Sequence, residues 1–444
     1  MIPALLLLAL SGVEGLDVFH VSPSGNDAND GRSPARAWKT VAKVNATSFQ
    51  PGDRILFARG GEWRECLKAS SDGAPGKPVT YEAYGSGAKP KFWGSDVVKD
   101  GKLATAPAAA LVDHVFVPWT WKDGALKVER AGLVTACVRV DLVNSNGKNH
   151  LVFRDLVADE SADAKDGYGF RVMGSRDVLL ENCEAYRAGR HHFGVINSTE
   201  FTGKGLRCGW AMPNCPGGAT FYVSFSDPSR KGDTHQWIDC AGENFDNPGQ
   251  RPYQIFYDHG EGLGPILIKN MTSKGGKFSV AGSKEAPVTI QGGLVENNSL
   301  EIFGSHLRVE GLVIKGDGAV DHFGTDSVFE NLVVDVEPKN GGPTGYGVAF
   351  LLREGAKNNA IRFCTLTKAL KAVGPGPASV VASIIPKAEG LTLGEHCLSD
   401  GQLGPDLRPG PPAIGKVPAP HPATDAAGRP RPKGPCAIGA YEPR

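Results

Sequence analysis

The chain has 444 residues, 58 of them glycine and 32 proline, together about one residue in five. This share argues against long helices, and it lies below the range of low-complexity chains, which argues against global disorder. The 48 basic and 48 acidic residues cancel to a formal charge of zero, and the basic residues are scattered. An electrostatic nucleic-acid footprint is therefore not supported.

The N-terminal segment predicts export. The only strongly apolar stretch, Met1 to Leu10, is followed by small residues up to Gly15 and is too short to span a bilayer as a helix. We therefore predict a signal peptide over residues 1–15, which places the mature protein in the periplasm, on the cell surface or in the medium. The prediction includes no membrane span.

Residues 16–95 predict an N-terminal cap and the first coils of a repeat. Apolar residues at helical spacing within 37–45 predict a short amphipathic helix that covers the open end of a solenoid. Two later segments alternate apolar and polar residues as strands do, 53–57 and 79–84. Residues 96–135 then interrupt the pattern and predict an inserted, hairpin-rich segment.

Residues 136–395 carry a recurring strand element and predict the central solenoid. Each copy after residue 150 alternates apolar and polar residues, ends in Asn, Asp or Gly before an apolar anchor, and recurs about every 26 residues. The anchors are Leu156, Cys183, Leu206, Cys240, Met271, Leu294, Leu312, Leu332 and Cys364. This period predicts an all-β solenoid of parallel coils about 4.8 Å apart, which bury one alternate set of side chains in a continuous core.

Turn and anchor residues of the coils have predicted structural roles. The asparagines before the anchors are candidates for stacked amide ladders, at Asn182, Asn270 and Asn331. The cysteines at anchor positions are predicted to be small buried side chains, at Cys183, Cys240 and Cys364. Other cysteines are spaced for local disulfides, Cys208 with Cys215 and Cys397 with Cys436. The proline-rich residues 396–444 predict an extended tail on the outside of the solenoid.

Several segments carry a family resemblance. They are residues 21–31, 51–57, 60–64 and 83–90, with a closing motif at 425–431 and 438–442. Together they resemble secreted right-handed parallel β-helix proteins of the pectate-lyase-like superfamily, although members commonly have Asp where this chain has Ala437. The resemblance implies a right-handed parallel β-helix and a polysaccharide lyase, glycoside hydrolase or epimerase. Because such a solenoid only provides a groove, the chemistry has to be argued from side chains.

The densest polar cluster surrounds two adjacent histidines. Elimination from a uronate needs a cation for the carboxylate and a base for the C5 proton, and we assign these roles to Arg190 and to His191 or His192. Lys204 closes the cluster and is assigned to substrate binding. The alternative is structural, with one histidine facing solvent and the other bonding a turn carbonyl.

A second cluster lies further along the chain. Alternation along an extended segment sends Tyr257, His259 and Glu261 to one face, where a histidine and a carboxylate suit general acid and base catalysis or a cation site. The alternative is a solvated glycine turn. A third group, Asp233 with His235, is assigned to substrate binding. Trp210 and Tyr257 are the aromatic residues best placed to stack on sugar rings.

The repeat also suggests a column of charge. Five successive coils carry a charged residue or a histidine ten or eleven positions before the next anchor: Arg230, Glu261, Lys284, Glu301 and His322. If the register holds, neighbouring members lie about 5 Å apart along a substrate groove, and Glu301 and His322 are therefore assigned to substrate binding. The alternative is an ion-pair ladder on a solvated β face, which contributes little stability.

One acidic loop suggests calcium. Residues 26–30 place oxygen ligands close together but lack the spacing of an EF-hand, so the alternative is a turn whose side chains bond their own backbone. Calcium is therefore a candidate cofactor without an assigned ligand set. No CxxC pair suggests zinc.

Taken together, the sequence predicts an exported carbohydrate-active β-helix protein whose partner is a polysaccharide or another glycan. Cations and histidines outnumber an obvious carboxylate pair, which favours a lyase over a hydrolase. Hydrolysis stays open, with Glu261 and either Asp233 or Glu301 as the carboxylates. The alternative function is a non-catalytic cell-envelope or glycan-binding β-helix.

Overall fold

The computed structural model describes residues 16–162, 167–211, 219–224, 234–243, 254–258, 265–339, 342, 344–374, 378–399, 417, 421–434 and 436–440. The predicted signal peptide lies outside these residues. The described part of the chain contains no helix long and apolar enough to cross a membrane.

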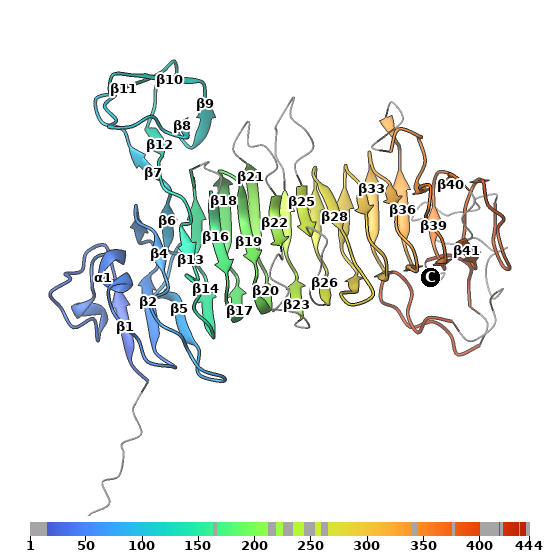
Figure 1. The fold of residues 1–444 in the computed structure, drawn as a ribbon, viewed down its shortest axis with the longest axis horizontal. Helices are drawn as coiled ribbons and strands as arrows, with labels where there is room; N and C mark the ends of the chain where they lie inside the picture. The colour runs from blue at the N-terminus through green and yellow to red at the C-terminus, as the bar shows by residue number, and fades with distance from the viewer. Residues whose placement is uncertain are drawn as a thin grey trace, which may run out of the picture.

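Three long parallel sheets wind around one axis, and each strand pairs with the equivalent strand of the next coil (Figure 1). Sheet A contains β1 (Val18–Val21), β2 (Arg54–Ala58), β5 (Val79–Tyr84), β14 (Leu151–Arg154), β17 (Arg176–Glu181), β20 (Thr199–Lys204), β23 (His235–Ile238), β26 (Ile266–Lys269), β29 (Val288–Gln291), β32 (Leu307–Glu310), β35 (Val328–Glu330), β38 (Asn359–Arg362) and β41 (Ala378–Val381). Sheet B contains β3 (Glu62–Trp63), β6 (Lys91–Trp93), β15 (Val157–Asp159), β18 (Glu184–Ala188), β21 (Arg207–Ala211), β24 (Ala241–Glu243), β27 (Thr272–Lys274), β30 (Leu294–Glu296), β33 (Val313–Gly316), β36 (Val333–Val336) and β39 (Thr365–Leu366).

Sheet C contains β4 (Leu67–Lys68), β13 (Val143–Asn144), β16 (Tyr168–Met173), β19 (His191–Ile196), β22 (Ala219–Ser224), β25 (Gln254–Asp258), β28 (Lys277–Val280), β31 (Leu300–Ile302), β34 (Val320–His322), β37 (Phe350–Leu352), β40 (Leu370–Ala372) and β42 (Ala388–Glu389). The chain visits the sheets in the order A, B, C and then begins the next coil. This connectivity confirms the predicted right-handed parallel β-helix.

The core lies inside the solenoid, because alternate residues of every strand point inward. On sheet C, Phe170, Phe193 and Phe221 occupy paired positions, and their ring centroids are 5.0 and 5.6 Å apart. Smaller chains continue the same column in later coils, including Leu300 and Val320. The stacked rings hold the coils in register, so that outward residues also line up from coil to coil.

The turn from sheet A to sheet B needs a left-handed residue in most coils. Asn182 and Asn270 adopt it with φ of 53° and 52°, and their side-chain amides donate across the coils to Asp155 and Asp239 respectively. Asn331 instead donates to the Thr424 carbonyl of the C-terminal segment (3.0 Å). The predicted amide ladder is thus replaced by separate Asn–Asp pairs, because the left-handed position also accepts Asp and Gly.

Asn182→Ala is expected to lower the free energy of unfolding by about 1–2 kcal/mol, because the left-handed conformation is strained for alanine and the bond to Asp155 is lost. Asn182→Gly is expected to lose less, since glycine adopts this φ without a Cβ clash. Urea unfolding of both variants tests this, and equal losses would contradict the assigned strain.

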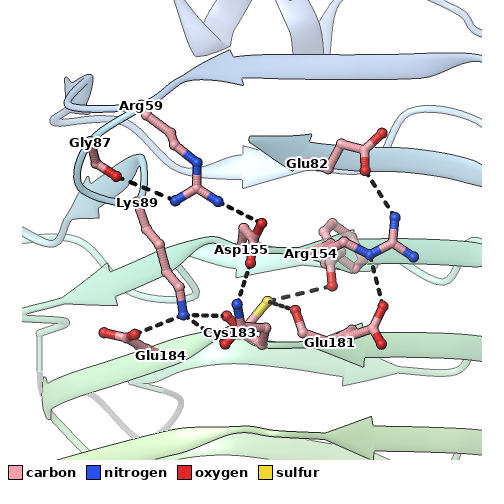
Figure 2. Close-up of polar contacts among 11 residues, drawn as sticks. Arg59, Glu82, Gly87, Lys89, Arg154, Asp155, Glu181, Cys183 and Glu184 are labelled. Carbon is pink, nitrogen blue, oxygen red and sulfur yellow. Dashed lines mark hydrogen bonds and ion pairs between the residues drawn. The ribbon is translucent and has the colours of Figure 1, made fainter. Parts of the chain in front are cut away.

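Ion pairs run along the outer face of sheet A (Figure 2). Arg154 bonds Glu82 (2.9 Å) on one side and Glu181 (2.8 Å) on the other. Lys204 continues the row to Glu181 (3.1 Å). Glu181 has a pKa below its usual value because both cations bond it. This alternating ladder is structural, and it places the predicted substrate-binding Lys204 on sheet A.

The cysteines behave partly as predicted. The anchor cysteines are buried free thiols, namely Cys183, Cys240 and Cys364. Cys397 and Cys436 are also free, so the predicted disulfide between them is not formed. Cys208 is a buried free thiol as well, and its predicted partner Cys215 lies outside the described residues.

The two ends and the insert differ from the coils (Figure 1). At the N-terminus, η1 (Pro34–Arg36) precedes α1 (Val41–Asn45), which Thr40 caps and whose Val41 and Val44 are buried against the first coils. Between β6 and β13 the chain forms an antiparallel sheet and a hairpin from β7 (Ser95–Val97), β8 (Ala109–Val112), β9 (Val115–Val117), β10 (Trp119–Lys122), β11 (Ala125–Val128) and β12 (Val134–Cys137). Near the C-terminus, Val417, Cys436 and Ile438 pack on the last strands of the solenoid.

Candidate functional site

One backbone position per strand forms a continuous row along sheet C, because the register pairs these positions one to one. The row runs through Asn144, Arg171, Gly194, Tyr222, Tyr257, Ser279, Glu301, Asp321, Leu351, Lys371 and Glu389. Tyr257 belongs to it by backbone register alone. The flanking residues of the strands whose side chains are described fill the core, so the row lies on the outer side of the sheet. Glu301, Asp321 and Leu351 are nevertheless buried there. We call it the sheet C outer row.

Two carboxylates stand on neighbouring strands of this row. Glu301 and Asp321 are paired positions of β31 and β34, which places their backbones about 4.8 Å apart. Glu301 accepts from Lys277 Nζ (2.5 Å) and from Ser279 Oγ (3.2 Å). Arg353 donates to both oxygens of Asp321, from Nε (2.7 Å) and from Nη2 (2.8 Å). These charge-assisted bonds fix the positions of both carboxyl groups.

Exposed aromatic rings adjoin the two carboxylates. Phe303 and Phe323 follow the acids by two residues, stack with centroids 5.2 Å apart, and are 51% and 39% exposed. Tyr346 is 45% exposed, with the Arg353 guanidinium 5.4 Å and Lys371 Nζ 5.2 Å from its ring centroid. Exposed rings beside fixed polar groups are typical of sugar-binding surfaces. We call Glu301, Asp321 and these neighbours the Glu301–Asp321 patch.

The patch was missed by the sequence analysis except for Glu301. Its signal is a repeated acid-X-Phe element, at 301–303 and 321–323. In both coils the acid lies eleven residues before the next anchor, so the column predicted to join Glu301 to His322 was wrong by one residue. His322 instead pairs with Ile302 on the inward side. Arg353 and Tyr346 gave no repeat signal, because they come from the longer connection around β37.

The rest of the predicted column is not assembled among the described residues. Lys284 lies between β28 and β29, off the strand positions of the outer row. Arg230, Asp233, His259 and Glu261 lie outside the described residues.

His191 is buried in the sheet C face. Its ring stacks on Tyr222 (centroids 4.1 Å apart) and lies 5.0 Å from the ring of Tyr168. A Cβ on Gly194 would come within 2.3 Å of the Tyr168 ring, so glycine makes room for this aromatic stack. Nδ1 of His191 accepts from the Ala219 N–H (2.9 Å). Burial, and then the charge of Arg190, lower the His191 pKa to about 3, which makes it a poor base at neutral pH.

His192 points to the other side and is also buried. Its Nε2 donates to the carbonyls of Gly209 (2.9 Å) and Trp210 (3.3 Å), and burial lowers its pKa to about 4. This matches the carbonyl-bonding part of the structural alternative. Neither histidine faces solvent, although alternation alone predicted that one does. Arg190 lies directly before β19, with its backbone N–H bonded to the Gly167 carbonyl (2.9 Å).

Two other predicted histidines are interior as well. His235 bonds the Ser198 carbonyl through Nε2 (2.8 Å). His322 donates from Nε2 to Asn359 Oδ1 (3.0 Å), and burial lowers its pKa to about 4. The structure therefore separates the predicted residues. Glu301 faces outward on sheet C, Lys204 lies on sheet A and Trp210 lies on sheet B.

Carboxylate oxygens of the acidic N-terminal loop accept hydrogen bonds from backbone N–H groups. Asp27 Oδ1 accepts from the N–H groups of Lys39 (2.7 Å) and Thr40 (3.0 Å), and Asp30 Oδ1 accepts from that of Arg32 (3.0 Å). These bonds correspond to the turn alternative. Across the described residues, no three His, Cys, Asp or Glu side chains are grouped to hold a metal ion.

Comparison with known proteins gives limited similarity. No family model matches the chain. A stretch of 75 residues is 36% identical to a lacto-N-biosidase of Bifidobacterium longum subsp. longum, covering 16% of this chain and only 5% of that protein. The solved pectate lyase Pel9A aligns over 97% of this chain and 98% of its own, with 14% identity and a TM-score of 0.46.

A second solved structure is the GH136 lacto-N-biosidase from Eubacterium ramulus. It aligns over 86% of this chain and 65% of its own, with 12% identity and a TM-score of 0.41. The strand pairing within the chain, rather than these alignments, establishes the fold.

Proposed function

We propose that the protein is a carbohydrate-active β-helix enzyme that hydrolyses a glycosidic bond over the Glu301–Asp321 patch. The observation that carries the proposal is the pair of ion-paired carboxylates on adjacent strands, beside exposed aromatic rings. The short sequence match to a lacto-N-biosidase supports a glycan as the substrate class.

The spacing of adjacent strands suits a retaining reaction, in which two carboxyl groups lie about 5–5.5 Å apart. Asp321 is the nucleophile, because the bidentate Arg353 holds its carboxyl group in a fixed orientation. Glu301 is the general acid. Its partner Lys277 has a flexible stem, so the ammonium group can move away from Glu301 when the leaving sugar oxygen takes its place.

In the first step, the Asp321 carboxylate bonds the anomeric carbon while Glu301 gives its proton to the departing oxygen. In the second step, Glu301 takes a proton from water, and the water oxygen replaces Asp321 at the anomeric carbon. Glu301 must bind the substrate in its protonated form, so sugar binding displaces Lys277. Phe303 and Phe323 hold neighbouring sugar rings by stacking.

Elimination is a second candidate, because Arg353 and Lys371 both lie beside Tyr346. With a uronate substrate, these cations neutralise the carboxylate, and the Tyr346 phenol is assigned to exchange a proton at the ring carbon. This version keeps the predicted lyase chemistry but moves it from the buried histidines to the patch. Export through the predicted signal peptide remains part of the proposal.

The test is a screen of the mature protein against neutral and uronate polysaccharides, with and without calcium. New reducing ends without an unsaturated product support hydrolysis, whereas an unsaturated uronate absorbance supports elimination. Binding without any product after long incubation supports the non-catalytic alternative. Cleavage that is unchanged in a variant with Glu301→Gln and Asp321→Asn contradicts the assigned site.

A further inference from the structure

A cavity opens on the outer face of sheet B, away from the Glu301–Asp321 patch. It has a volume of about 300 Å³, at the lower end of the range for small-molecule sites. Its walls are Tyr186, Arg207, Cys208, Gly209, Trp210, Ala241 and Glu243, and we call it the Trp210 cavity. Gly209 stands between Tyr186 and Glu243 in the register of the sheet, so the floor there is bare backbone.

Trp210 is held in this cavity by a strained backbone. Its φ of +52° lies in the left-handed region, which is a genuine outlier for a bulky residue. Such backbone strain is unfavourable and concentrates at functional sites. His192 helps to hold the distortion, because it donates to the carbonyls of Gly209 and Trp210. The buried histidine thus acts as a structural support for Trp210.

The same distortion recurs in three successive coils. Glu160, Arg187 and Trp210 all have positive φ, at 58°, 46° and 52°, and stand one above another at the end of sheet B. Arg187 is anchored below by Asp159 and lies 3.7 Å from Glu160. Its guanidinium is 5.5 Å from the centroid of the Trp210 ring. The Trp210 indole therefore packs against the guanidinium of Arg187, which Asp159 holds in place.

The indole is at the same time available to a ligand. Trp210 is 42% exposed, and the ring of Tyr186 lies 5.7 Å away at 50° to it. Tyr186 donates to Glu184 (3.1 Å), which fixes its ring. Two rings set at an angle above a glycine floor match the apolar C–H face of a sugar ring.

The polar rim indicates which sugars fit. Arg207 and Glu243 line the cavity from adjacent strands, and Lys274 lies 3.5 Å from Glu243. Guanidinium and carboxylate groups both bond hydroxyls, so this rim suits a ring that carries hydroxyls and no charge of its own. We infer that the Trp210 cavity is a second carbohydrate-binding site, separate from the catalytic patch, that stacks a neutral pyranose ring of a glycan chain on Trp210.

The experiment uses the full mature chain with Glu301→Gln, so that the probes are not consumed. Isothermal titration calorimetry measures the binding of xylohexaose, cellohexaose, lacto-N-tetraose and trigalacturonate. At least one neutral probe is expected to bind, and Trp210→Ala is expected to weaken that binding about tenfold. Trp210→Phe should retain most of it. The binding of trigalacturonate is expected not to change when Trp210 is substituted.

Two variants keep the outcome decisive. Trp210→Gly removes the ring and also adopts the left-handed φ without strain, so it serves if Trp210→Ala folds poorly. Val115→Ala removes an exposed apolar side chain from the inserted sheet, outside both sites, and should leave this binding unchanged. The inference is overturned if no neutral probe binds, if the folded Trp210 variants bind normally, or if Val115→Ala weakens binding equally. Failure of catalysis in the polysaccharide screen leaves this test unaffected.

Discussion

Glu301→Gln and Asp321→Asn are each expected to lower the rate of glycan cleavage by about 10²–10⁴-fold, on any substrate that the screen identifies. Both amides keep the shape of the side chain and can still accept from Lys277 or Arg353, so the fold should persist. The glutamine cannot donate the proton to the leaving oxygen, and the asparagine cannot bond the anomeric carbon. The measurement is kcat/KM of each variant, with circular dichroism to confirm folding.

The two losses should not add. Because the residues act in one reaction, the double variant is expected to be little slower than the slower single variant. Glu310→Gln is the matched control, since Glu310 is an acid on sheet A, a different sheet from that of the patch, and is paired to Arg308 (3.5 Å). If both single variants remain within twofold of the parent enzyme, these carboxylates do not carry the reaction.

Acidification from pH 6.5 to pH 4 is expected to destabilise the protein strongly. Burial lowers the pKa of His191 to about 3 and those of His192 and His322 to about 4, whereas an unfolded histidine titrates near 6.5. In this window the unfolded chain binds more protons than the folded one, so stability falls as pH falls. Each histidine contributes up to about 1.4 kcal/mol per pH unit.

Other groups titrate with distinguishable effects. Glu181 and Asp27 have lowered pKa values, so their stabilisation is lost only on further acidification. Burial raises the pKa of Asp159, and this carboxyl therefore opposes the histidines in sign. Urea unfolding at several pH values measures the slope. His192→Phe should reduce the slope by about one proton while lowering stability at pH 7, and an unchanged slope would show that His192 does not titrate in this way.

The fold was predictable because it repeats. A coil contributes one anchor in every turn from sheet A to sheet B, so the period of small apolar residues such as Cys183 and Cys240 is visible in the sequence. The left-handed turns also show, since they select Asn, Asp or Gly. The amide ladder was not predictable, because each position chooses among these three residues independently, and Asn331 is engaged by the C-terminal segment.

The candidate site was predictable only in part. Residue type drew attention to His191 and His192, but sequence could not show that neighbouring aromatic rings and backbone carbonyls cover them. The positions of Glu301 and Asp321 are implied by a shared distance of eleven residues to the next anchor. That distance is informative only once the strand register is known, because the connections differ in length from coil to coil.

The sequence alone therefore determined the solenoid, the period of its coils and the class of residue at each turn, since all three depend on local alternation and on backbone preference. Only the tertiary structure decided which polar residues meet. Arg353 reaches Asp321 from a different coil, and His192 reaches the backbone carbonyl of the strained Trp210 through the interior. Such meetings depend on the winding of the chain and on which side chains cover others, and these are properties of packing that no single segment encodes.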